Sequence, residues 1–206
     1  VGEQLNLTAS TIETVAANSL GLHSGGALDV SADIAQTVVM SAIDVSSTDM
    51  YVMLNRTLDI SAVHEIALET TTLFVDAAED MIQTVGRNFE VAAGSSISVS
   101  SGGRLDASAA ESASLAAGEI EIVSGNTLNV STTALNFEID ANMSLAVADS
   151  VQVATGKAEL LVENSFDATV GGGLALASAA VSVTSGSTVD VVSTDSISAK
   201  SAAIEL

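Results

Sequence analysis

The sequence contains no proline, cysteine or tryptophan, only 2% of its 206 residues are aromatic, and five Lys and Arg residues face 26 Asp and Glu residues. Without cysteine the chain can form neither a disulfide framework nor a thiolate metal site. A net charge of −21 argues against nucleic-acid binding, because that binding relies on basic side chains that neutralise phosphates. No apolar run approaches the ~18 residues that a membrane-spanning helix needs.

What the chain does have is apolar content, at 48%, and this content is periodic. Such a fraction is too high for a chain that is disordered merely because it is acidic. Apolar residues recur at steps of 23 residues in two series that run through the whole chain. The first series comprises Leu5, Leu28, Tyr51, Phe74, Ile97, Ile120, Met143, Phe166 and Val189. The second comprises Leu20, Ile43, Ile66, Phe89, Leu135, Val181 and Ile204, with Ser112 and Ala158 at its two remaining positions.

A third series lies between the other two and changes phase once. Its later part comprises Leu105, Leu128, Val151, Leu174 and Ile197, again in steps of 23. Its earlier part comprises Ile12, Ala35, Leu58 and Met81, one residue out of phase with the later part. We interpret the change as a corner residue that switches sides between the fourth and fifth repeats.

Most residues of the first two series have an apolar partner two positions later, with a polar residue between them. Alternation with period 2 is the signature of a strand with one buried face. Three short strands in each 23-residue repeat predict an all-β fold, a single-chain three-sided parallel β-helix of about nine rungs. Nine repeats of 23 would need 207 residues, so one solenoid is expected to span residues 1–206.

Glycine and proline usage agrees with this architecture. Gly-rich stretches at 25–26, 102–103, 125–126 and 171–173 are expected at corners, where positive φ or close backbone approach favours glycine. Proline is absent, as expected where interior rungs donate their N–H groups to neighbouring rungs.

Four corner segments share the pattern Gly, two residues, then apolar-Asp/Asn-apolar or a close variant of it. They are GGALDVSA (25–32), GGRLDASA (102–109), GNTLNVST (125–132) and GSTVDVVS (186–193). This pattern resembles the shaft repeats of large surface β-helix proteins of the filamentous-haemagglutinin type. The resemblance implies an extended shaft at the cell surface or outside the cell, and it carries over no functional residues.

The residues favour no catalytic, cofactor-binding or metal-binding site. His23 and His64 fall at different places in their repeats, so a metal-binding pair is not expected. Asp167 and Asp190 are expected on adjacent rungs, as acids are in solenoid enzymes that cleave polysaccharides, but the five basic residues are scattered singly. The acidic faces are expected to take up divalent cations only diffusely. Four N-x-[ST] sequons, at Asn6, Asn55, Asn129 and Asn142, leave glycosylation open.

Both ends of the sequence are in full repeat register and show no capping segment. The rods are therefore expected either to stack on copies of themselves or to continue into further repeats of a longer chain. The leading hypothesis is a structural component of an extracellular β-solenoid filament or fibre, with no enzymatic activity. The alternative is the shaft of a cell-surface adhesin whose binding domain lies outside this sequence.

Overall fold

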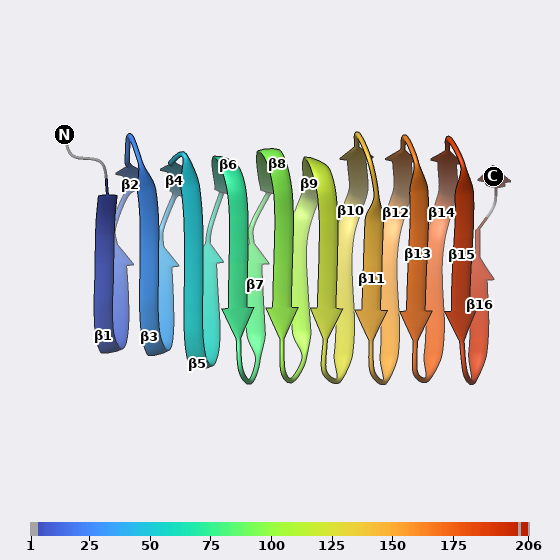
Figure 1. Cartoon of the computed structure of the whole chain (residues 1–206), viewed down its shortest axis with the longest axis horizontal. Helices are drawn as coiled ribbons and strands as arrows, with labels where there is room; N and C mark the ends of the chain where they lie inside the picture. Colours follow the sequence, from blue (N-terminus) through green and yellow to red (C-terminus); the bar gives the residue numbers. More distant parts are fainter. Residues whose placement is uncertain (1–3, 202, 206) are drawn as a thin grey trace.

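The computed structural model describes residues 4–201 and 203–205, and these form a β-solenoid without any helix. About nine coils of about 23 residues are stacked along one axis, with the two ends of the chain at opposite ends of the stack (Figure 1). All strand pairings are parallel, and they join the strands into a single sheet. The predicted all-β parallel solenoid is therefore confirmed.

The described residues contain seventeen strands. They are β1 (Gln4–Ala16), β2 (Leu20–His23), β3 (Ala27–Val39), β4 (Ala42–Ser46), β5 (Asp49–Ala62), β6 (Glu65–Ala77), β7 (Met81–Val85), β8 (Asn88–Ser101), β9 (Leu105–Ser124), β10 (Thr127–Ile139), β11 (Met143–Val147), β12 (Ser150–Val162), β13 (Ser165–Val170), β14 (Gly173–Ser185), β15 (Thr188–Ser193), β16 (Ser196–Lys200) and β17 (Ala203–Glu205).

Each coil has three straight segments, and we name the three faces of the solenoid after the series they carry. The first face holds the segments around Leu28 and Ile97, the second those around Ile66 and Leu135, and the third those around Leu105. Long strands cross a corner, where the pairing register skips positions. Thus β3 joins the first face to the third, β6 joins the second to the first, and β10 joins the third to the second.

Inward side chains stack on like side chains of the next coil and fill the interior. Of the three predicted series, the residues that lie buried are Leu28, Ile97, Ile120, Met143, Ile43, Ile66, Leu135, Val181, Leu105, Leu128 and Val151. Four more are partly buried against this core, namely Leu20, Phe89, Phe166 and Leu174. Close packing of this kind makes the core sensitive to the loss of even single methylene groups.

Tyr51 and Phe74 were predicted to lie in the core ladder of the first face, and this prediction is wrong. Leu28 pairs with Met50, Met50 with Leu73, and Leu73 with Ile97. The step from 28 to 50 is 22 residues and the step from 73 to 97 is 24, so the two coils between are displaced by one residue. Because strand side chains alternate, a one-residue displacement turns both rings to the outer face.

The remaining ladder residues lie in the outermost described coils. Leu5, Val189 and Ile197 pair in register with Leu28, Phe166 and Leu174, yet they are 37%, 47% and 57% exposed because only one neighbouring coil covers each. The backbone of Ile204 pairs with that of Val181, while its side chain lies outside the described residues.

The phase change of the third series is located by the pairing of Met81 with Leu105, a step of 24 residues. On the second face, the same coil places Ala113 rather than Ser112 between Phe89 and Leu135. Corners therefore absorb single-residue insertions and deletions, while the register of each straight segment is kept by its buried face.

Candidate functional site

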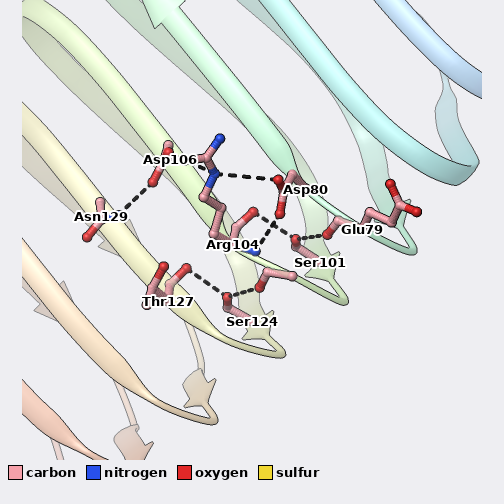
Figure 2. A network of polar contacts seen from close by, with 9 residues as sticks. Glu79, Asp80, Ser101, Arg104, Asp106, Ser124, Thr127 and Asn129 are labelled. Carbon is pink, nitrogen blue, oxygen red and sulfur yellow. Dashed lines mark hydrogen bonds and ion pairs between the residues drawn. The ribbon is translucent and has the colours of Figure 1, made fainter.

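The most extensive polar network of the described residues lies at the corner between the first and third faces (Figure 2). Arg104 is its centre. Its backbone N–H donates to Asp80 Oδ1 at 3.0 Å, and its Nε lies 3.5 Å from Asp80 Oδ2 and 3.5 Å from Asp106 Oδ2. Asn129 Nδ2 then donates to Asp106 Oδ1 at 2.7 Å. One arginine thus holds together carboxylates of neighbouring coils that would otherwise repel one another.

Two buried serines underlie this network. Ser101 Oγ lies 2.8 Å from the carbonyl oxygen of Glu79 and 3.0 Å from that of Arg104. One coil further on, Ser124 Oγ lies 3.0 Å from the carbonyl oxygen of Gly103 and 2.9 Å from that of Thr127. Each hydroxyl has one proton to donate, so it can serve either the carbonyl of its own coil or that of the coil before.

The same arrangement of one hydroxyl between two carbonyl oxygens recurs at other corners, and the sequence analysis did not predict it. The hydroxyls that lie against two carbonyl oxygens include those of Thr70, Thr132, Thr155, Ser178, Ser185 and Ser193. Each follows a residue of an apolar ladder by four positions, as Ser101 follows Ile97 and Thr132 follows Leu128. A search for Ser or Thr at that spacing would have found them.

The close approach expected at glycine corners is present. A Cβ atom added to Gly125 would lie 2.1 Å from the carbonyl oxygen of Gly102, and one added to Gly102 would lie 2.1 Å from that of Ala78. Backbone of consecutive coils therefore touches at this corner, directly beside the Arg104 network. Gly25 differs, since a Cβ there would meet nothing within 4 Å.

A shallow groove of about 660 Å³ runs over the outer side of the third face, across β9, β10, β12, β14 and β16. Small outward side chains such as Ser131 and Ala154 form its floor, and Asn129 and Gln152 supply amide groups. Asp106 is the only carboxylate that lines it, and Lys200 the only cation. The groove offers hydrogen-bonding groups, but it brings together no pair of titratable groups for proton transfer.

The residues that the sequence analysis weighed as sites are exposed. Asp167 and Asp190 are register neighbours on β13 and β15, as expected, and both are exposed. His23 and His64 are exposed, and His23 pairs with Ser46. Within the described ranges, no cluster of three His, Cys, Asp or Glu residues could hold a metal ion. Over the same ranges, no helix is long and apolar enough to cross a membrane.

Most basic side chains are already engaged with carboxylates. Arg56 lies 3.6 Å from Glu79, Arg87 3.9 Å from Glu111, and Lys157 2.7 Å from Glu159, measured between charged nitrogen and oxygen atoms. These pairs are solvent-exposed, where each contributes at most ~1 kcal/mol. The acidic surface is therefore neutralised only locally.

Comparisons with protein-family models, with curated proteins and with solved structures give no match to this chain.

Proposed function

We propose that this chain is a structural component of an extracellular β-solenoid filament or fibre. The observation that carries the proposal is the uninterrupted parallel pairing of equivalent segments from β1 to β17. Each coil presents to the next the same backbone edge and the same apolar ladders. A face that is complementary to itself can be repeated without limit, either within one chain or between copies of it.

The corner hydroxyls and the Arg104 network support a mechanical role. They add side-chain hydrogen bonds and ion pairs between coils, along the direction in which a fibre is loaded. The outward carboxylates support it as well, because like charges on the side faces oppose lateral sheet-to-sheet association and leave axial pairing free.

The second candidate is the shaft of a cell-surface adhesin, in which the same coils act as a spacer and another part of the chain binds the target. The self-complementary coil supports this candidate equally. The two candidates differ in what lies beyond the stack: a second molecule in a filament, or more of the same chain in a shaft.

Electron microscopy of the native material, combined with the mass of the intact chain, tests the proposal. Nine coils at about 4.8 Å each give a rod of roughly 43 Å. Filaments much longer than this that consist of chains of 206 residues would support the filament, whereas long rods of a much heavier chain would support the shaft. Short rods that stay monomeric at every concentration would contradict both candidates.

A further inference from the structure

The two rings that the register displacement turns outward form an unusual feature of the first face. Tyr51 and Phe74 are neighbours on β5 and β6, with ring centroids 6.4 Å apart and planes tilted by 43°. Tyr51 is 37% exposed, and Met53, beside them on the same outer side, is 53% exposed. The chain has only five aromatic residues, one Tyr and four Phe, so two of the five are placed where they stabilise no core.

Carboxylates surround this aromatic patch, which we define as Tyr51, Met53 and Phe74. Asp29 is the register neighbour of Tyr51, Asp76 is that of Met53, and Asp49 lies two positions before Tyr51 on the same side of β5. Adjacent strands lie about 4.8 Å apart, so each carboxylate is within reach of a group that covers the rings. In the part of the chain that the structure describes, these three carboxylates form no ion pair and no side-chain hydrogen bond.

Aromatic faces bordered by free carboxylates fit one ligand chemistry best. A guanidinium group stacks on an aromatic ring through its planar face and pairs with a carboxylate through its edge, and it is more weakly hydrated than an ammonium group. Tyr and Arg are also the residue types that contribute most to protein–protein binding energy. A second copy of this chain does not supply such a partner, because its three arginines, Arg56, Arg87 and Arg104, are already paired with carboxylates.

We infer that the aromatic patch is a docking site for an arginine-rich segment of a partner protein, which would attach that partner to the side of the rod. The inference does not depend on how the coils continue along the axis. A docking role explains why these two aromatic side chains face outward, which core packing does not explain. At the same outer positions one coil further on, where the register is restored, the chain carries the small polar residues Ser98 and Ser100.

The protein provides its own probe, because Tyr51 is the only tyrosine and the chain has no tryptophan. The intact protein is titrated with a peptide that carries Arg at alternate positions, with Gly and Ser between, and its tyrosine fluorescence is followed. The control is the same peptide with Gln in place of Arg. We expect a saturable change with the Arg peptide and none with the Gln peptide.

Two pairs of variants separate the patch from general charge attraction. Asp49→Asn with Asp76→Asn is expected to weaken binding of the Arg peptide at least fivefold. The matched control, Asp167→Asn with Asp190→Asn, makes the same change of charge on the same face and is expected to weaken it less than twofold. Equal effects of the two pairs would overturn the inference, because overall charge alone would then hold the peptide.

The rings are tested by Tyr51→Leu with Phe74→Leu, which keeps an apolar surface and removes the aromatic faces. Binding is followed by the anisotropy of a labelled Arg peptide, and an unchanged thermal unfolding midpoint shows that the fold is kept. We expect at least fivefold weaker binding, and wild-type affinity would overturn the inference. A saturable tyrosine signal with a soluble β-linked glucose oligosaccharide but not with the Arg peptide would overturn it too, and would identify a saccharide platform.

Discussion

The buried corner hydroxyls are the side chains whose removal has the most sharply defined cost. Ser101 is 1% exposed, and its Oγ lies within hydrogen-bond distance of two carbonyl oxygens. Ser101→Ala removes this donor, while the carbonyl oxygens of Glu79 and Arg104 keep the backbone N–H groups of Gly103 and Met81, so the loss is that of one hydrogen bond, about 0.5–1.5 kcal/mol. We therefore expect the free energy of unfolding, measured by urea denaturation, to fall by about 0.5–1.5 kcal/mol.

Ser47 is the matched control, because it is buried at a corner and its Oγ has no hydrogen-bond partner. Its counterpart in the next coil, Thr70, does lie against two carbonyl oxygens. Ser47→Ala removes an unsatisfied polar atom, so the unfolding free energy is expected to stay the same or to rise by up to about 1 kcal/mol. If both alanine variants lost the same stability, the hydroxyl contacts would not be the cause.

Tyr51 also shows how far sequence reasoning reaches at the scale of a residue. The 23-residue period was sufficient to predict the parallel solenoid and most of its core, because inward side chains must alternate and stack. The period could not predict the outward orientation of Tyr51 or Phe74. One coil is a residue shorter than 23 and a later coil is a residue longer, so the 23-residue period is the same before and after them. The register of each coil is decided by the whole strand, because the register that buries Phe74 would also turn the carboxylate of Asp76 into the core.

At the scale of a strand and its corner, the contact of consecutive coils decides which residues are allowed. Gly125→Ala would place a Cβ 2.1 Å from the carbonyl oxygen and 2.8 Å from the carbonyl carbon of Gly102. Both atoms are backbone, so the corner between β9 and β10 must move as a whole. We expect a loss of about 2 kcal/mol or more in unfolding free energy, measured by urea denaturation.

Gly25→Ala is the control at a glycine corner between the second and first faces, because its Cβ would meet nothing within 4 Å. Its effect is expected to stay within ~0.5 kcal/mol, with a small gain from reduced freedom of the unfolded chain. Equal destabilisation by the two substitutions would show that the glycines are needed for backbone conformation and not for close approach between coils. This distinction was open in the sequence, where both explanations fitted the Gly-rich segments.

At the scale of the whole molecule, repulsion between carboxylates is the interaction that destabilises the stacked coils. The net charge of −21 is distributed over about nine coils, and register neighbours such as Asp167 and Asp190 place like charges about one strand spacing, ~4.8 Å, apart. Unfolding separates these carboxylates, so their repulsion lowers the stability of the folded rod. Interior hydrogen bonds and apolar ladders are insensitive to moderate salt, but exposed carboxylates are screened by it.

Raising NaCl from about 0.02 M to about 0.5 M shortens the Debye length several-fold, and the thermal unfolding midpoint is therefore expected to rise by several degrees. Circular dichroism at 218 nm, near the strand minimum, measures the midpoint directly. Asp167→Asn with Asp190→Asn should raise the midpoint at low salt and reduce its salt dependence, because it removes one stacked pair. A midpoint independent of NaCl would contradict the expectation that repulsion between exposed carboxylates lowers the stability of the rod.

Divalent cations distinguish diffuse screening from a specific site in the same experiment. CaCl2 and MgCl2 at matched ionic strength are expected to raise the midpoint slightly more than NaCl does and to resemble each other, because ions held diffusely respond to charge rather than to coordination geometry. A saturable stabilisation by Ca²⁺ at low concentration, absent with Mg²⁺, would contradict this expectation. Such a result would require oxygen ligands from several coils to converge, an arrangement that the described carboxylates, spread along the outer faces, do not form.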